Sequence, residues 1–455
     1  MPDVAVKPTT GDTTGGSREG TPPAAFDAIV VGAGPAGAAA ALTLARAGKS
    51  VALLERGIFP GAKNMYGGVV YGRVLDDLVP NWWQDVPYQR WVSRRATMLM
   101  TPTQSLTIDY RSDRWIEAPY NGMTAYRADF DAWLAAKAEE AGATLVCSTT
   151  ATSLLRGADG RIRGVSTDRP DGDLTARVVI ACDGVNSFLA KSAGLYQAFD
   201  PSNFTVGVKE VLRLPREVID ERCRLTGDEG LDIEIVGCTA GIPGGGFFYT
   251  NRDSVAVGIV VSVVGLAAAR VRPEKLLADL KKHPSIAPLV RDGELLEYSA
   301  HTIPEGGYDV MPELVGDRLL IAGDAAAMCL AAGIWLEGVN FAIGSGAAAG
   351  EAAAEALDQG DASVATLAGY RRRIEANFVL ADHRKFRRVP HLIMSERVQR
   401  QYPPFVCDIV EKMFTVDNPT PKLGLRRWAN DARRTHGVRL RDLLRDGAVG
   451  LRSFG

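Results

Sequence analysis

Three glycines, Gly32, Gly34 and Gly37, form a GxGxxG pattern, and an acid, Glu55, follows the last of them by eighteen positions. The first glycine permits a tight turn, the second lets the backbone approach a pyrophosphate, and the third lets a helix lie close to a sheet. A carboxylate at the position of Glu55 can accept hydrogen bonds from ribose hydroxyls. The spacing therefore predicts a dinucleotide site.

The elements around these residues are those that such a site needs. Residues 29–31 and 51–54 are typical of two buried parallel strands, with an alanine-rich helix between them. The free N–H groups at the start of that helix face the negative charge of the phosphates. Because NAD and FAD both bind to this motif, the motif alone leaves the choice of cofactor open.

Two further segments contain residue types suited to the same ligand. The glycine-rich stretch 61–72 indicates a loop passing close to a flat group, with an ordinary surface turn as the alternative. Arg127 precedes a helix predicted from about Ala128 to Glu140. Its guanidinium can form a forked pair with pyrophosphate oxygens or a salt bridge to Asp129 or Asp131, and the residues alone leave this open.

Later in the chain, acids follow apolar strands. Asp183 and Gly184 end one such strand, and Gly323 and Asp324 follow a strand predicted at 319–322. Ligands of α/β proteins gather at the carboxyl ends of strands. These positions therefore join the candidate site.

A long helix of small residues is predicted to begin near Glu337. Its free N–H groups, around Gly338 to Asn340, offer positive partial charge to an electron-rich ligand atom. Residues 196–300 alternate as strands do, at Val206–Leu212, Leu231–Ile235 and Ser254–Val264. Here Gly244 to Gly246 precede Phe247, Phe248 and Tyr249, which predicts a flat apolar pocket or a core cluster at a strand edge.

Composition limits the class of protein. A chain of 455 residues predicts two or three domains, and 52 basic against 54 acidic residues argue against a nucleic-acid binder. The six cysteines are scattered without a CxxC pair, so we expect neither a zinc site nor a cysteine-ligated iron–sulfur cluster. Residues 371–455 carry 19 Lys and Arg against nine Asp and Glu. This basic region suits an acidic protein partner or anionic lipid, or is simply a solvated helical surface.

Seven segments together resemble the FixC family, relatives of electron-transfer flavoprotein:quinone oxidoreductase. They are GAGPAG with Glu55, KNMYGGVVYG, YRADFD, ACDGVNS, GGGFFYTNRD, YSAHTIPEGGYDVMPELVGDRLLIAGDAA and EGVNFAIGSG. The resemblance extends from Phe26 to about Ala356. It implies an α/β fold in which a glutathione-reductase-type FAD-binding Rossmann domain carries an inserted mixed or antiparallel sheet for the quinone, followed by a C-terminal helical region.

The resemblance also implies FAD and the residues that hold it. Arg127 would contact the pyrophosphate, Asp324 the ribityl chain, and the turns near Asn64 and Gly338 the isoalloxazine ring. The full cofactor-binding set is Gly32, Gly34, Pro35, Ala36, Gly37, Glu55, Arg56, Lys63, Asn64, Gly67, Gly68, Arg127, Asp183, Gly184, Gly323, Asp324, Gly338, Val339 and Asn340.

We expect the chain to divide as follows. Residues 1–25 form a disordered tail; 26–86, 120–195 and 300–365 form a discontinuous FAD domain; 87–119 and 196–299 form the quinone-type sheet domain; and 366–455 form a helical docking region. The tail lacks the apolar core of a secretion signal, and no apolar run is long enough to span a bilayer. We therefore expect a cytoplasmic protein, bound peripherally to the inner face of the cell membrane.

By the same resemblance, electrons pass from partner flavoprotein subunits, FixA-like and FixB-like, through FAD to menaquinone or ubiquinone. A FixX-like ferredoxin supplies the iron–sulfur cluster, and the complex oxidises NADH by electron bifurcation. No catalytic side chain is required, although His301 and Glu305 are candidate proton donors to the quinone. Two alternatives remain: a stand-alone NAD(P)H-dependent flavin reductase or monooxygenase of the geranylgeranyl reductase type, and a docking subunit whose flavin is structural.

Overall fold

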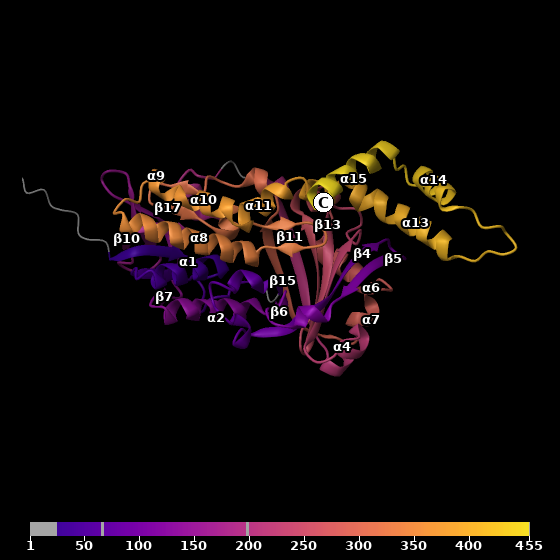
Figure 1. Cartoon of the computed structure of the whole chain (residues 1–455), viewed down its shortest axis with the longest axis horizontal. Helices are drawn as coiled ribbons and strands as arrows, with labels where there is room; N and C mark the ends of the chain where they lie inside the picture. The colour runs from indigo at the N-terminus through magenta and orange to yellow at the C-terminus, as the bar shows by residue number, and fades with distance from the viewer. Residues whose placement is uncertain (1–24, 65–67, 197–199, 455) are drawn as a thin grey trace, which may run out of the picture.

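A computed structural model of the chain describes residues 25–64, 68–196 and 200–454. Of the tail expected at residues 1–25 only Ala25 is among the described residues, and the predicted site residue Gly67 also lies outside them. Figure 1 shows an elongated molecule in which a layered α/β part, a large twisted sheet and a group of C-terminal helices follow one another along the long axis. The predicted fold class is confirmed.

The strands are β1 (Phe26–Val31), β2 (Val51–Leu54), β3 (Gly68–Val70), β4 (Tyr88–Met100), β5 (Ser105–Arg111), β6 (Met123–Ala125), β7 (Thr144–Val146), β8 (Ala151–Arg156), β9 (Ile162–Thr167), β10 (Leu174–Ala181), β11 (Phe204–Arg213), β12 (Glu229–Val236), β13 (Gly244–Thr250), β14 (Ser254–Ser262), β15 (Glu294–Pro304), β16 (Val315–Gly316), β17 (Leu319–Ile321), β18 (Leu330–Ala331) and β19 (Leu336–Glu337). The helices are α1 (Pro35–Arg46), α2 (Arg127–Glu140), α3 (Phe188–Ser192), α4 (Arg216–Cys223), α5 (Val263–Ala269), α6 (Pro273–Lys282), α7 (Ala287–Val290), α8 (Val339–Asp358), α9 (Val364–Leu367), α10 (Gly369–Ala376), α11 (Phe378–Lys385), α12 (Val389–Ile393), α13 (Tyr402–Phe414), α14 (Leu425–Thr435) and α15 (Leu440–Phe454).

The first sheet runs β16-β17-β10-β1-β2-β7, with β9 paired to β10 and β8 to β9, and its five strands from β17 to β7 pair in parallel. Ile29 of β1 lies opposite Ala52 on one side and Val179 on the other. These strands are apolar on both faces because helices cover the sheet, and α1 lies between α2 and α8 (Figure 1). The carboxyl ends of the parallel strands therefore lie at one edge of the sheet, next to the glycine turn after β1.

The second sheet runs β15-β11-β14-β13-β12-β4-β6-β3, with β5 paired to β4. One face is apolar: Phe248, Val257 and Ile259 pack with side chains of α4, α6 and α7 in a single core. Alternation along the strands directs the neighbouring side chains to the other face. The aligned pairs Glu234–Phe247 and Asp232–Tyr249 lie on this second face.

Two of the element boundaries that differ from the predictions made from periodicity have a clear local cause. The strand predicted at Ser254–Val264 ends at Ser262, because the Ser262 hydroxyl accepts a hydrogen bond from the Gly265 N–H at 3.2 Å and caps α5. The long helix begins at Val339 instead of near Glu337, because Leu336 and Glu337 pair with β18 in a short hairpin.

The C-terminal helices extend the chain past the second sheet. Figure 1 shows α13, α14 and their connection projecting from one end of the molecule. Within the described part of the chain, every helix is too short or too polar to cross a bilayer.

Candidate functional site

The glycine turn after β1 has different requirements at each of its three positions. Gly32 has φ +98°, a backbone conformation that favours glycine, and a Cβ there would lie 2.3 Å from the Cys182 carbonyl oxygen. A Cβ on Gly37 would lie 1.8 Å from the Gly32 carbonyl oxygen. At Gly34, by contrast, no described protein atom lies within 4 Å of an added Cβ. The protein itself therefore needs Gly32 and Gly37, while Gly34 leaves open space at the start of α1.

Glu55 lies beside this turn and is 8% exposed. The Ala33 N–H donates to its Oε2 at 3.1 Å, and the Gly57 N–H donates to its Oε1 at 2.6 Å. Each carboxylate oxygen accepts more than one hydrogen bond, so ribose hydroxyls can be added to these backbone donors. The backbone thus holds the Glu55 carboxylate in place before any ligand binds.

Helices α1 and α8 run in the same direction, and at their N-terminal ends α8 extends beyond α1. Added Cβ atoms on Gly346 and Gly350 would lie 2.0 Å and 2.7 Å from the carbonyl oxygens of Ala36 and Ala40, respectively. The two helices therefore run parallel in close contact. Measured from the Gly346–Ala36 contact, α8 begins six residues further out than α1. At 1.5 Å per residue its N-terminus lies about 9 Å beyond that of α1, so two sets of free N–H groups are staggered along one line.

Arg127, the first residue of α2, forms a forked pair with a carboxylate of the protein. Its Nε and one terminal nitrogen lie 2.8 Å and 2.9 Å from the two oxygens of Asp131, which is fully buried. The Asn64 amide donates to the same carboxylate. The salt bridge that the sequence left open therefore forms with Asp131. Because a guanidinium has five N–H donors, Arg127 retains donors for a second anion.

Two acids lie at the carboxyl edge of the first sheet. Asp183 accepts a hydrogen bond from the Leu189 N–H at 3.0 Å through Oδ2, while its buried Oδ1 has no partner among the described residues. Burial raises the pKa of Asp183 above its usual value. Burial also raises the pKa of Asp324, although the positive charges of Arg127 and His301 oppose this shift. The Gly323 N–H is already bound to the Ser345 hydroxyl at 3.0 Å.

The remaining predicted residues lie around this edge in varied environments. Arg56 and Lys63 are exposed. No described protein atom lies within 4 Å of a Cβ added to Gly68 or Gly184. At the helix cap Gly338 the nearest atom to an added Cβ is the Cys329 sulfur, at 3.9 Å. Asn340 is buried and donates to Glu337 at 2.6 Å. Pro35 and Val339 are the first residues of α1 and α8, respectively.

Taken together, these features fit an extended dinucleotide. Gly34 leaves open space at the start of α1, a buried Asp183 oxygen has no partner among the described residues, and two parallel helix starts point along the same line. Backbone N–H groups of this kind suit a pyrophosphate and a second electron-rich group further along.

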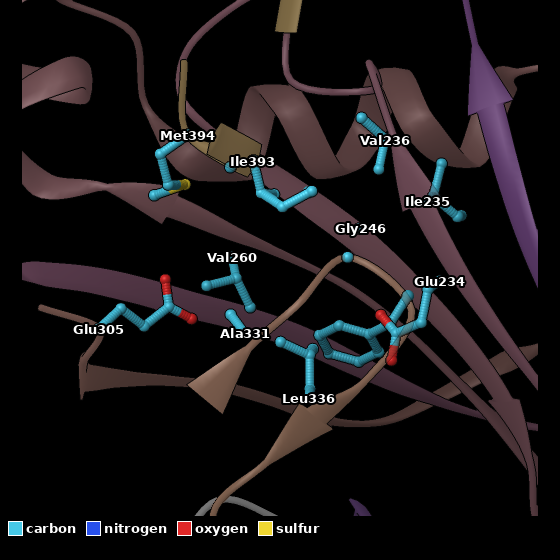
Figure 2. A pocket seen from close by; sticks show the side chains of 14 residues that line it. Glu234, Ile235, Val236, Gly246, Val260, Glu305, Ala331, Leu336, Ile393 and Met394 are labelled. Atoms are coloured by element: carbon cyan, nitrogen blue, oxygen red, sulfur yellow. The ribbon is translucent and has the colours of Figure 1, made fainter. Parts of the chain in front are cut away.

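A cavity lies where the second sheet meets the hairpin before α8 and helix α12. It contains about 440 Å³ of space free of atoms, part of it open to solvent. Figure 2 shows apolar side chains around it, with one carboxyl group on each side. The lining residues are Glu234, Ile235, Val236, Gly244, Gly245, Gly246, Phe247, Val260, Glu305, Ala331, Gly333, Leu336, Ile393 and Met394. The glycine run and Phe247 therefore form a pocket wall, one of the two structures expected from the sequence.

Several charged groups on this face of the sheet were not predicted. Asp232 pairs with Arg95, whose Nε lies 3.1 Å from Oδ2. Burial raises the pKa of Glu234 well above its usual value, and the negative charges of Asp232 and Glu305 add to the shift, which Arg95 opposes. The sequence does contain a signal for this charged face, because Asp232 and Glu234 alternate with apolar residues in β12 and so point to the same side of the sheet.

Lys209 of β11 is a further unpredicted group. It is almost fully buried, and its ammonium lies 3.3 Å from the Tyr249 hydroxyl. Burial lowers the pKa of Lys209 to about 7, although the negative charge of Glu297 opposes the shift. His301 also lies on this face; burial lowers its pKa, Asp324 opposes that shift, and Arg127 adds to it. This face of the second sheet thus carries several titratable groups, and His301 among them lies near charges of the dinucleotide site.

Comparison with known families matches three parts of the chain. Residues 27–197 match the family described as FAD dependent oxidoreductase, and residues 204–303 match ETF-QO, ubiquinone-binding. Residues 389–455 match the ETF-QO/FixC family C-terminal domain.

Individual relatives align over nearly the whole chain. A protein of Escherichia coli (strain K12) named probable electron transfer flavoprotein-quinone oxidoreductase YdiS is 40% identical over 93% of this chain and 98% of its own length. Protein FixC of the same strain is 38% identical over 94% of this chain and 98% of its own. Protein FixC of Bradyrhizobium diazoefficiens is 40% identical over 88% and 92%, respectively.

Solved structures share the fold at lower identity. A geranylgeranyl bacteriochlorophyll reductase-like protein of Thermoplasma acidophilum superposes with a TM-score of 0.68 at 20% identity, covering 92% of this chain and 99% of that one. The flavin-dependent halogenase CmlS superposes with a TM-score of 0.61 at 19% identity, covering 90% and 76%.

Proposed function

This chain belongs to the FixC family of electron-transfer flavoprotein:quinone oxidoreductases, and we propose that it passes electrons from a partner electron-transfer flavoprotein through FAD to a quinone. It is an FAD-dependent oxidoreductase. Two subunits like FixA and FixB are the proposed electron donors. The acceptor is menaquinone or ubiquinone.

The proposed cofactor residues are those that form the dinucleotide site. Gly34 and the start of α1 would receive the pyrophosphate, Glu55 the adenosine ribose, and Arg127 a phosphate oxygen through its remaining donors. The N-terminus of α8 would stabilise negative charge on the flavin ring by its free N–H groups. Bound FAD supplies a carrier that accepts and releases electrons one or two at a time.

The observation that carries the proposed acceptor is the apolar cavity on the second sheet. Its wall includes Gly244, Gly245, Gly246 and Phe247, and these residues lie within the segment that matches the quinone-binding family. A flat, mostly apolar ring with two polar oxygens suits a pocket of this composition. The cavity also meets the β18–β19 hairpin, whose second strand ends one residue before the helix cap of α8.

We further propose that the chain works in an NADH-oxidising, electron-bifurcating complex with a ferredoxin-like subunit resembling FixX. The scattered cysteines support a separate cluster-bearing subunit, since cluster ligands need closer spacing.

Peripheral contact with the inner face of the cell membrane is part of the proposal. Apolar side chains are exposed along and after α13, at Met413, Phe414 and Val416, and again at Leu425 of α14. Arg426 and Arg427 follow and are also exposed. Exposed apolar side chains beside arginines suit an anionic lipid surface. This segment projects from one end of the molecule (Figure 1).

Reconstitution tests the proposal. The chain is loaded with FAD, mixed with its electron-transfer flavoprotein and ferredoxin-like partners, and given NADH while the flavin absorbance is followed. Bleaching that requires the partner flavoprotein, followed by recovery on adding a quinone analogue, supports the proposal. Rapid bleaching by NADH without a partner would instead indicate a stand-alone reductase or monooxygenase. Assembly without flavin reduction would indicate a docking subunit.

A further inference from the structure

The apolar cavity on the second sheet is bounded by two carboxyl groups. Figure 2 shows Glu305 on one side and Glu234 on the other, with Val260, Ala331 and Leu336 between them. A para-quinone has one carbonyl oxygen at each end of a flat, largely apolar ring. The two acids are therefore candidate polar partners for the carbonyl oxygens of a quinone bound in this cavity.

The surroundings of Glu305 favour a proton-carrying carboxyl. Its backbone N–H donates to the Asn203 carbonyl at 2.9 Å, which anchors the residue directly after β15. The charged and titratable groups that face it are Glu234 from β12 and the Cys329 thiol before β18. Helix α12 contributes apolar Ile393 and Met394 to the same wall.

These surroundings set the protonation of both acids. Burial raises the pKa of Glu305 to about 7, although a hydrogen bond with the Thr205 hydroxyl opposes the shift. The pKa of Glu234 is raised well above its usual value by burial and by the nearby charge of Asp232. The shift of the Glu234 pKa favours its neutral form, while Glu305, with a pKa of about 7, exchanges a proton readily at neutral pH. An acid whose pKa lies near the working pH is the effective donor.

We propose that Glu305 is the proton donor to the quinone that binds in this cavity, with Glu234 as the polar partner of the second quinone oxygen. The inference rests on the proposed function, which supplies two electrons from the reduced FAD. As the quinone is reduced, the O–H bond of the Glu305 carboxyl breaks and an O–H bond forms on the adjacent quinone oxygen. Solvent then reprotonates the Glu305 carboxylate, and the second proton reaches the other quinone oxygen from solvent.

The structure separates Glu305 from His301, the other candidate donor. His301 lies on β15 opposite Gly207 and is not part of the cavity wall. Its charged neighbours, Asp324 and Arg127, belong to the dinucleotide site. A role for His301 at the quinone is therefore not supported by its position.

The test compares Glu305→Gln with Glu313→Gln, the same chemical change at an exposed position. Each FAD-loaded protein is reduced with dithionite in stopped flow and reoxidised either by a water-soluble ubiquinone analogue or by ferricyanide, which takes electrons without protons. We expect Glu305→Gln to slow reoxidation by the quinone by about 100-fold, the usual contribution of a general acid. Reoxidation by ferricyanide should stay within about twofold, and Glu305→Asp should restore part of the quinone rate.

The pH profile provides the second reading. Because only the protonated carboxyl donates, the wild-type quinone rate should fall as pH rises through about 7. This step should be absent in Glu305→Gln and present in Glu313→Gln. An infrared titration should show a carboxyl that ionises near this pH in the wild type and lose that band in Glu305→Gln. Quinone rates and pH profiles that do not change in Glu305→Gln, or a band that persists, would overturn the inference.

The outcomes also separate this inference from the proposed function. If wild-type FAD is reoxidised by ferricyanide but not by the quinone, the quinone assignment fails and the role of Glu305 fails with it. If the wild type reduces quinone and Glu305→Gln matches it, the function stands and only the donor assignment is wrong.

Discussion

The paired substitutions Gly34→Ala and Gly37→Ala separate the needs of the ligand from those of the fold. Both add one methyl group to the same glycine turn, three residues apart. At Gly37 the new Cβ would lie 1.8 Å from the Gly32 carbonyl oxygen, a backbone atom that cannot rotate away. At Gly34 the new Cβ meets no described protein atom within 4 Å, and φ −72° with ψ −176° is available to alanine.

The expected magnitudes follow from these contacts. Overpacking against a fixed backbone atom destabilises by about 1–3 kcal/mol or more, so Gly37→Ala should lower the melting temperature of the FAD-free protein clearly. For Gly34→Ala, the loss of a preferred helix-cap residue and the reduced entropy of the unfolded chain are each under about 1 kcal/mol and opposite in sign. The FAD-free stability should therefore change by less than about 0.5 kcal/mol. FAD affinity should instead fall by at least about tenfold, or 1.4 kcal/mol, because the methyl group occupies the space through which the pyrophosphate would approach the backbone.

Circular dichroism of the FAD-free proteins measures the first quantity, and quenching of FAD fluorescence on binding measures the second. The wild type and Gly424→Ala, the same change at an exposed helix cap with no described atom within 4 Å of the added Cβ, are the references. Gly34→Ala that binds FAD as tightly as the wild type would refute the placement of the pyrophosphate at the start of α1. Gly37→Ala that melts at the wild-type temperature would refute the close helix–sheet contact.

Three other results are expected. Glu305→Gln should gain stability relative to the wild type as pH rises. The pKa of Glu305 in the folded protein is about 7, above the usual 4.5, so the stability that the neutral carboxyl contributes below pH 4.5 is lost as pH rises through 7, by up to about 3 kcal/mol. Melting temperatures of the two proteins that change in parallel across this range would contradict the prediction. Asp131→Ala should destabilise by up to about 3 kcal/mol, since it removes the buried carboxylate that pairs with the partly buried Arg127. Asp129→Ala, at an exposed position, should change stability by less than about 1 kcal/mol, as measured by denaturant unfolding. Replacing Arg426 and Arg427 together by Gln should weaken sedimentation with anionic vesicles by about 2 kcal/mol, or roughly 30-fold, with no change for neutral vesicles, and equal binding would exclude this segment as the lipid contact.

The dinucleotide half could be predicted because its requirements are local. The left-handed turn at Gly32 and the close packing of Gly37 on the Gly32 carbonyl lie within six residues of the chain, and Glu55 follows at the spacing that the motif requires. Apolar runs such as residues 29–31 identify a buried strand without knowledge of its neighbours. Periodicity also placed α2 within one residue of its observed start.

Predictions were weaker where a distant partner decides the outcome. Arg127 had a choice of acids or a phosphate, and only the fold shows that Asp131 is its buried protein partner. The start of α8 shifted by two residues because a hairpin partner, β18, takes up Leu336 and Glu337. Periodicity within one segment contains no information about such pairing.

The sequence by itself determined the order of elements, the dinucleotide turn and membership of the family. Tertiary structure alone decided that Glu234 and Glu305, 71 positions apart, face one cavity, and that His301 does not. The reason is physical. Local backbone geometry depends on neighbouring residues, whereas the burial and charge environment of a carboxyl group depend on strand register and on helices contributed by remote parts of the chain.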